Sequence, residues 1–270
     1  MHDEAIEHAG KVWEEDIIRY CAGLYKGHWL PSHDIGHHKR VWKNACLISS
    51  RFPIEGEYNQ DVFFEQLIIA CYFHDMGLLC EKGPRHGKES RRICEEFIRL
   101  HTDKIHYETD TMLLAIEHHD DKDYASEEDS EQSVLYQVLT LADDLDAFGA
   151  IGCYRYIEIY LMRNLESESI PGLILENATN RLNNFKLKVK RSEFLQELIQ
   201  EKYDRLRILL DKDSYTENPE GLVKWINREL VQPQADPFEF LKKTEIEALN
   251  NERIRFYIEE FVEELSSLLY

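Results

Sequence analysis

The stretch that most constrains this chain is the apolar run Leu67–Phe73, which ends abruptly in His74-Asp75 and then Met76-Gly77. Such a run is typical of a buried helix, and burying a polar group without a partner costs roughly 2–7 kcal/mol. A metal ion is the usual partner that makes a buried imidazole beside a carboxylate favourable. Other His-Asp dipeptides occur, but only this one follows a long apolar run, so it predicts an interior site.

Length and composition indicate a folded protein of one large domain or two small ones. The chain has 270 residues, of which 43% are hydrophobic, and this fraction argues against disorder. The longest uncharged apolar run is far shorter than the roughly 18 residues that span a membrane. The first four residues lack the basic and apolar regions of a signal peptide, and the six cysteines form no C-x-x-C pair. We therefore expect reduced thiols and a cytoplasmic protein without a membrane partner.

The net charge of −20 restricts the partners that the chain can take. General binding to DNA, RNA or an anionic membrane needs a basic surface, so no stable nucleic-acid complex is expected. A small anionic substrate is still compatible with this charge, provided that a metal ion or a local basic patch receives it.

The hydrophobic pattern predicts an all-α fold, because apolar residues recur at helical spacing and no segment shows sustained alternation. The acidic, polar stretch 120–132 and the Pro- and Gly-containing stretch 166–172 read as loops, and the second is the expected domain boundary. We therefore expect a first domain at 1–166 and a helical extension at 167–270. The predicted helices share the 3.6-residue period and span about 3–27, 33–52, 60–74, 86–100, 107–119, 133–148, 149–164, 173–187, 192–210, 219–231 and 243–268.

Ten of the twelve histidines lie between His28 and His119, so the first half of the chain is expected to carry the chemistry. His33 and His37 are one helical turn apart and share a face. A zinc-protease helix of the H-E-x-x-H type would need glutamate at the position of Asp34, and Gly36 weakens that interpretation further. Histidines near the start of a helix are the structural alternative.

Three further groups are candidates for a site. His86 follows a glycine-containing loop and stands among the basic residues 82, 85, 88, 91 and 92, which form either a phosphate-binding rim or a solvated helix face. The run His118-His119-Asp120 repeats the pattern of His74-Asp75, with surface capping as its alternative. Asp143, Asp144 and Asp146 stand in an apolar helix, where three carboxylates repel each other unless they are exposed or bind a cation.

Taken together, these residues resemble the pattern H…HD…D of the HD superfamily of metal-dependent phosphohydrolases. The motif residues are His37, in the phrase H-x-x-R-V, then His74-Asp75, and then Asp143, in the phrase A-D-x-L-D-A. The resemblance covers about residues 20–165 and is greatest for the small bacterial stand-alone members. It implies an all-α HD-domain bundle with a C-terminal helical extension.

The resemblance also implies a site and a chemistry. His37, His74, Asp75 and Asp143 would hold one divalent ion, and His74, Asp75 and Asp143 would be the catalytic residues. A second ion is implied by the additional histidines, with Asp75 as the bridge; the second set is His86, His118 and His119. The donor set suits Mn²⁺, Fe²⁺, Co²⁺, Ni²⁺, Zn²⁺ or Mg²⁺, and the ion would supply hydroxide to a phosphorus atom.

The substrate implied is a nucleotide or another small phosphoester. Arg40, Lys82 and Arg85 are the expected phosphate contacts, and Asp144 and Asp146 are expected to orient the metal ligands. Two branches of the superfamily fit less well. The Gly-Tyr-Pro signature of the cyclic-dinucleotide phosphodiesterases does not follow His119, and Leu78 stands where the nucleotidases carry a catalytic glutamate.

Two alternatives from other classes remain open. One is a non-catalytic module that senses a nucleotide in the same pocket, and the other is an HD-type di-iron oxygenase. The helical region 173–270 would cover the active site, complete the core or form a homodimer contact, and its basic strip Lys186–Arg191 reads as a solvated helix face. The intact ligand positions favour the hydrolase.

Overall fold

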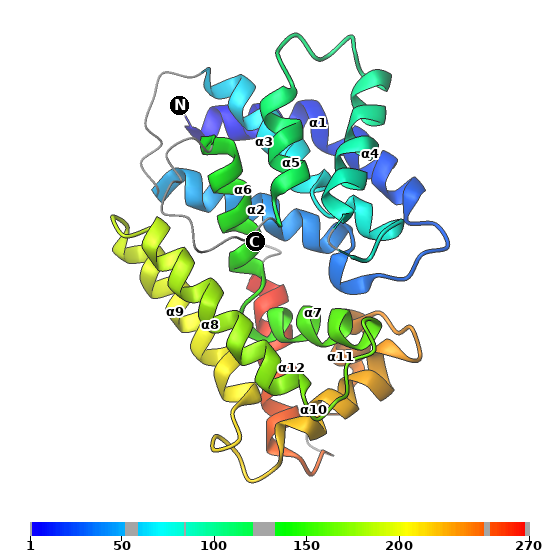
Figure 1. Ribbon diagram of the computed structural model, residues 1–270, viewed down its shortest axis with the longest axis vertical. Helices are drawn as coiled ribbons and strands as arrows, with labels where there is room; N and C mark the ends of the chain where they lie inside the picture. The colour runs from blue at the N-terminus through cyan, green and yellow to red at the C-terminus, as the bar shows by residue number, and fades with distance from the viewer. Residues whose placement is uncertain (1, 52–58, 84, 121–132, 246–248, 268–270) are drawn as a thin grey trace. The chain divides into compact units, whose positions relative to one another are not determined.

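The computed structural model describes residues 2–51, 59–83, 85–120, 133–245 and 249–267. Within these ranges the chain forms helices and no strand, so the prediction of an all-α fold is confirmed (Figure 1). The acidic loop predicted at 120–132 falls outside the described residues except at its first position. All six cysteines are unpaired, as the reduced-thiol prediction requires.

The helices divide into two compact units, Met1–Asp143 and Asp144–Tyr270. The first unit contains α1 (His2–Leu24), η1 (Pro31–His33), α2 (Ile35–Arg51), α3 (Gln60–Phe73), η2 (Met76–Leu79), α4 (His86–Leu100), α5 (Asp110–His118) and most of α6 (Val134–Asp146). The second unit contains α7 (Gly149–Met162), α8 (Ile170–Lys188), α9 (Glu193–Leu210), α10 (Pro219–Ile226), the π-helical turn η4 (Asn227–Val231), α11 (Pro237–Lys243) and α12 (Glu252–Ser267).

The first unit is organised around α3, which packs against α1, α2, α4 and α5 (Figure 1). Every residue from Leu67 to Phe73 is buried, because a helix that is apolar on all sides has to be surrounded. The segment Gln60–Leu79 is long and apolar enough to cross a membrane, yet 78% of the tested window is buried inside the protein. In this structure it is the core helix of the first unit.

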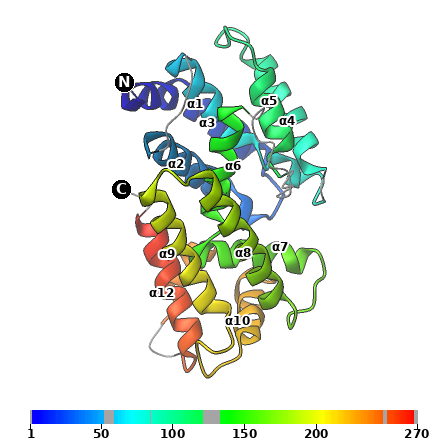
Figure 2. The same ribbon diagram turned by 60° about the vertical axis from the view of Figure 1, so that its left-hand side comes forward.

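The second unit is built on α7 and the pair α8–α9, which run side by side in both views (Figures 1 and 2). The first ten residues of α7 are all buried, because α8, α9 and α12 pack around it. Glu264 of α12 accepts hydrogen bonds from the N–H groups of Ala150 and Ile151, at 2.9 and 3.2 Å. These are unsatisfied donors of the first turn of α7, so α12 caps that helix.

Two expectations about the second half differ from the structure. The units divide inside α6, after Asp143, whereas the composition of 166–172 suggested a boundary there. The reason is that α7 packs with α8, α9 and α12, which places its apolar surface in the second core. The expected break after 231 is present at 232–236, but the predicted helix 243–268 differs: Pro237 starts the short helix α11, with Asp236 capping it, and the last helix begins at Glu252.

Candidate metal centre

The end of α3 places His74 and Asp75 in the interior. The N–H of His74 still donates to the carbonyl oxygen of Ala70, so α3 is helical up to this point. Asp75 then leaves the helical conformation (φ −105°, ψ 4°) and begins η2. This turn allows neighbouring side chains, which would point about 100° apart on a regular helix, to converge on one place. His74 is fully buried and Asp75 is 5% exposed.

Four side chains from three helices meet there and form the first group of donors. The Nε2 atoms of His37, on α2, and His74 are 3.2 Å apart. Each of the two lies 3.3 Å from Oδ2 of Asp75 and 3.8 Å from Oδ1 of Asp143, on α6. All four side chains are buried, and their donor atoms lie within 4.8 Å of one another. The structure therefore brings together the complete H…HD…D pattern predicted from the sequence.

A second group uses the other oxygen of Asp75. The Nε2 atoms of His86, on α4, and His119, at the end of α5, are 3.3 Å apart. Oδ1 of Asp75 is 3.4 Å from the first nitrogen and 3.0 Å from the second. The Asp75 carboxylate thus presents one oxygen to each pair of histidines, which is the arrangement of a carboxylate between two cations.

The distances fit metal ligands better than they fit hydrogen bonds. Two nitrogens that bind one ion at 2.0–2.1 Å, with bond angles from octahedral to tetrahedral, lie roughly 2.9–3.4 Å apart. The nitrogen pairs here, at 3.2 and 3.3 Å, fall in that range. Imidazole and carboxylate donors without thiolate suit Mn²⁺, Fe²⁺, Co²⁺, Ni²⁺ or Zn²⁺. The residues present therefore fit a divalent metal site.

Backbone carbonyls fix the histidines in the form that a metal needs. Nδ1–H donates to Cys71 from His74, to Gly83 from His86 and to Ile116 from His119, at 2.8–2.9 Å. A histidine that donates through Nδ1 presents the lone pair of Nε2 to the site. In this tautomer, three histidines from three elements present Nε2 to the two groups.

Two glycines let the helices approach closely enough to assemble the second group. A Cβ atom at Gly87 would lie 2.1 Å from the carbonyl oxygen of Glu117, so α4 touches the end of α5 only because position 87 has no side chain. A Cβ atom at Gly77 would meet the backbone of His86 at 1.9 Å, and the N–H of Gly77 donates to Oγ of Ser90 at 2.8 Å. These contacts bring His86 beside the end of α3.

The electrostatics follow from the carboxylates. Burial opposes the charged form of His74, but the Asp75 and Asp143 carboxylates outweigh it and raise its pKa to about 10. Burial likewise opposes charge on His86, while Asp75 raises its pKa to about 9. Burial alone would raise the pKa of Asp75, yet His74, His119 and His37 hold it well below its ordinary value. Without a metal, protons on His74 and His86 balance the buried carboxylate.

Sequence reasoning missed one part of the surroundings. The Tyr25 phenol donates to the carbonyl oxygen of His33 at 2.5 Å and lies 2.8 Å from Nε2 of His38. Burial, followed by the neighbouring histidines, holds the pKa of His38 well below its ordinary value. His33 is also buried, with its Nε2 3.9 Å from Oδ2 of Asp75. Of these residues, only His33 has a local sequence signal, because it stands four residues before His37.

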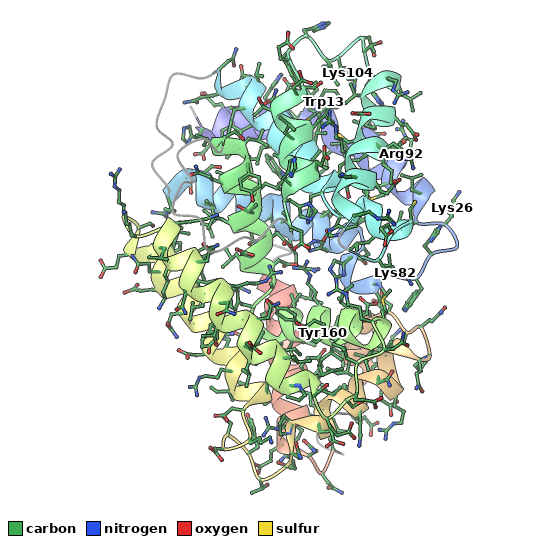
Figure 3. The ribbon with its side chains drawn as sticks, in the orientation of Figure 1. Trp13, Lys26, Lys82, Arg92, Lys104 and Tyr160 are labelled. Atoms are coloured by element: carbon green, nitrogen blue, oxygen red, sulfur yellow. The ribbon has the colours of Figure 1, made fainter. Side chains whose placement is uncertain are left out.

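Several predicted site residues lie elsewhere. His118 is exposed and belongs to none of the histidine and carboxylate groups among the described residues. The neighbouring His119 faces Asp75, and adjacent residues on a helix point about 100° apart. Lys82 is exposed (Figure 3), and Arg85 is exposed and paired with Glu81 at 3.2 Å. Arg40 lies in the second turn of α2, one turn after Gly36. Phosphate contacts by these three cations remain a prediction.

Asp144 and Asp146 bind arginines of the second unit. Arg181 donates to Oδ1 of Asp144 at 2.6 Å, and Arg155 donates to Oδ2 of Asp146 at 3.3 Å. Neither aspartate belongs to the histidine and carboxylate groups among the described residues. Their expected role in orienting the metal ligands remains a prediction, and it would be exerted through α6, the helix that they share with Asp143.

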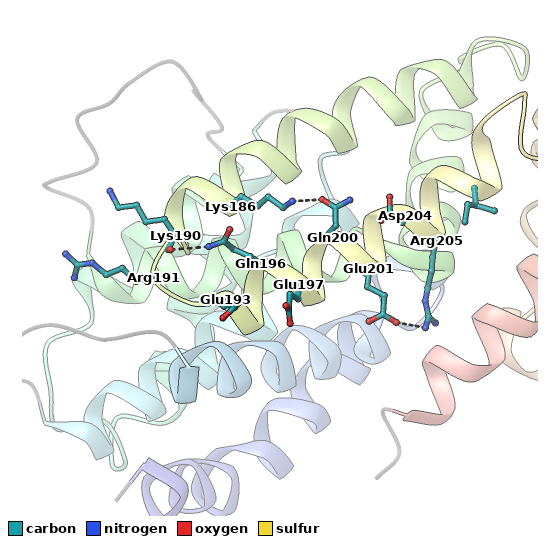
Figure 4. Close-up of a pocket in the computed structure, with 11 residues that line it drawn as sticks. Lys186, Lys190, Arg191, Glu193, Gln196, Glu197, Gln200, Glu201, Asp204 and Arg205 are labelled. Atoms are coloured by element: carbon teal, nitrogen blue, oxygen red, sulfur yellow. Dashed lines mark hydrogen bonds and ion pairs between the residues drawn. The ribbon is translucent and has the colours of Figure 1, made fainter.

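The basic strip Lys186–Arg191 borders an open groove along α9 (Figure 4). Four basic and four acidic side chains line this groove, so it has no net charge to attract an anion. Lys186 donates to the side chain of Gln200, and Arg205 pairs with Glu201. The strip is a solvated face, as the sequence indicated.

Residues 33–147 match the family model of the HD domain. This range contains His37, His74-Asp75, His86, His119 and Asp143, which are all the residues of the two donor groups described above. No curated protein and no solved structure matches the chain.

Proposed function

We propose that the protein hydrolyses a phosphoester, because residues 33–147 match the HD domain and proteins of the HD superfamily are generally metal-dependent phosphohydrolases. The observation that carries the proposal is the position of Asp75. Its two oxygens face two separate histidine pairs, so one carboxylate serves two donor groups. We infer that the site holds two divalent ions, one between His37 and His74 and one between His86 and His119.

The residues have distinct tasks in this proposal. His37, His74 and Asp143 would hold the first ion, His86 and His119 would hold the second, and Asp75 would contribute to both groups. When bound, divalent ions supply Lewis acidity and lower the pKa of a bound water toward ~7, which gives a nucleophile at neutral pH. The carbonyls of Cys71, Gly83 and Ile116 keep the imidazoles from turning and so hold the nitrogen donors in place.

The charge of the chain explains why the substrate would need the metals. The net charge of −20 includes two aspartates, Asp75 and Asp143, that are buried in the donor groups. A phosphoryl group would be repelled by this surface without a local positive charge. We therefore propose that the ions themselves are the main anion receptor, and that the substrate is a small phosphoester such as a nucleotide.

Phosphate release tests the proposal. The metal-free protein is loaded with Mn²⁺ and given an aryl phosphate, an aryl phosphodiester and a set of nucleotides. Turnover by the wild type and its loss in Asp75→Asn, which removes the charge between the two pairs, are the expected results. His101→Gln is the matched control, since His101 also bonds a carbonyl through Nδ1, but lies in none of the donor groups of the described residues. Equal turnover by the wild type and Asp75→Asn would refute the proposal.

A second candidate function is an iron-dependent oxygenase. The observation in its favour is the group of His86, His119 and Asp75, because two histidines and one carboxylate are the ligands of many non-haem Fe(II) oxygenases. Oxygen consumption by the iron-loaded protein, without release of phosphate from any phosphoester, would favour this candidate. Binding of nucleotides without turnover of either kind would favour the regulatory module.

A further inference from the structure

The last turn of α6 carries three carboxylates. Asp143, Asp144 and Asp146 are 6%, 3% and 5% exposed, so water screens none of them well. The C-terminal end of a helix is the negative pole of its dipole, and carboxylates are unfavourable there. They also repel one another across a single turn. This turn should unwind unless each carboxylate is balanced by a positive charge.

Two of the balancing charges are arginines that belong, like Asp144 and Asp146, to the second unit. Arg181, on α8, donates to Asp144 at 2.6 Å and to the side-chain oxygen of Asn177 at 3.2 Å. Its guanidinium also stacks over the ring of Tyr156, 5.8 Å from the ring centre. These contacts hold the guanidinium from three sides, and only 14% of its side chain is exposed. Arg155, on α7, balances Asp146 in the same way at 3.3 Å.

The third carboxylate is the metal ligand. Asp143 faces His37 and His74, so its balancing charge is the ion assigned to that group. The backbone next to it is held from the first unit, where Asn44 donates to the carbonyl oxygen of Ala142 at 3.1 Å. Along α6, Asp143 therefore follows a residue whose carbonyl oxygen is hydrogen-bonded and precedes the two aspartates that pair with arginines.

We propose that Arg181 is a positioning residue for the metal centre, which it stabilises by keeping the last turn of α6 helical so that Asp143 points at His37 and His74. The inference rests on the proposed metal centre and assigns a task to the second unit. Because the ion and Arg181 stabilise the same turn, their effects are coupled, and each strengthens the other. Loss of Arg181 removes its charge-assisted hydrogen bond to Asp144 and weakens the turn, so Asp143 is held less firmly in its direction.

The test measures Mn²⁺ binding to the full-length, metal-free protein by the disappearance of the free Mn²⁺ signal in electron paramagnetic resonance. Three variants are compared with the wild type: Arg181→Met, the double variant Asp144→Asn with Arg181→Met, and Arg205→Met. Arg205 is the matched control, because it is a half-buried arginine of the second unit that pairs with Glu260 on α12 and with Glu201 on its own helix. Thermal unfolding of each variant shows how much general stability is lost.

Arg181→Met is expected to weaken binding of the ion assigned to His37, His74 and Asp143 by about 10–100-fold, the usual effect of losing a residue that supports a metal ligand. The double variant should regain much of this loss, because the turn then carries one carboxylate fewer. Arg205→Met should lower the unfolding temperature and leave Mn²⁺ binding unchanged. Equal binding by the wild type and Arg181→Met, or equal weakening by Arg181→Met and Arg205→Met, would overturn the inference. A wild type that binds no Mn²⁺ would instead overturn the proposed function.

Discussion

Alanine at position 87 is expected to separate the two helices that carry the second histidine pair. The new Cβ atom would lie 2.1 Å from the carbonyl oxygen of Glu117, whereas ordinary contacts begin at 3.4 Å. The backbones of α4 and the end of α5 must therefore move apart by about 1.3 Å, since neither is the flexible end of a side chain. The Nε2 atoms of His86 and His119, now 3.3 Å apart, would lie up to about 4.6 Å apart.

That separation is too wide for one ion, since two nitrogens at 2.0–2.1 Å from it lie roughly 2.9–3.4 Å apart. We expect Gly87→Ala to lose the second ion, with an affinity roughly 10–100-fold lower, the usual range for a displaced ligand support. The first ion should stay, because α2, α3 and α6 supply its ligands. The overpacked contact should also lower the free energy of unfolding by ~1–3 kcal/mol.

The assay is a titration of the metal-free protein with Mn²⁺ or Zn²⁺ that resolves two binding steps, followed by elemental analysis of the desalted protein. Gly10→Ala is the matched control, because Gly10 lies in α1 and a Cβ atom there meets nothing within 4 Å. It should bind both ions and be as stable as the wild type or slightly more stable. Two ions bound to Gly87→Ala with unchanged affinities would show that the packing of α4 on α5 does not set the site.

Four further outcomes are expected. Asp75→Asn should reduce the amount of bound metal more than any single histidine variant, because both histidine pairs lose their shared carboxylate. Two ions found in this variant by elemental analysis would contradict the expectation. The raised pKa values of His74 (about 10) and His86 (about 9) keep both imidazoles protonated at pH 7. Metal binding should therefore release protons, and the metal affinity should increase as the pH rises. An indicator dye can measure the released protons, and metal binding without proton release would contradict this expectation. The same shifts stabilise the metal-free protein fully below about pH 6.5, and this contribution should disappear as pH rises through 9–10, as thermal unfolding at several pH values can check. Arg253→Met should lower the free energy of unfolding by about 2–4 kcal/mol in urea, because the buried guanidinium donates to four backbone carbonyls, and a loss below about 0.5 kcal/mol would contradict this.

The sequence could predict the first donor group because each member stands in a distinctive local setting. His74-Asp75 ends an apolar run that only a buried helix explains, and Asp143 stands in a second apolar helix. Burial then forces these polar side chains to share a partner. His37 was the least certain of the four from the residues alone, and the resemblance to the HD superfamily selected it from its histidine neighbours.

The sequence could not choose between His118 and His119. Neighbouring residues on a helix point about 100° apart, and which of them faces Asp75 depends on where α5 ends and how α4 packs against it. That packing is set by Gly87, whose role appears only in three dimensions. The contact of Tyr25 with His33 and His38 is likewise a tertiary feature with no local pattern.

The division of the chain was also beyond the reach of composition. The stretch 166–172 has the polar, Pro- and Gly-containing character of a boundary, but it only connects α7 to α8 within the second unit. The actual division falls inside the continuous helix α6, between Asp143 and Asp144. Sequence patterns mark where helices stop, and a boundary that lies within a helix leaves no such mark.

The most direct test of the metal centre is anomalous X-ray scattering from crystals of the metal-loaded protein, measured at the absorption edge of the bound element. Two anomalous peaks are expected, one among His37, His74 and Asp143 and one beside His86 and His119, with the carboxylate of Asp75 between them. A metal-loaded crystal with no peak at these side chains, or with peaks only elsewhere, would contradict the account.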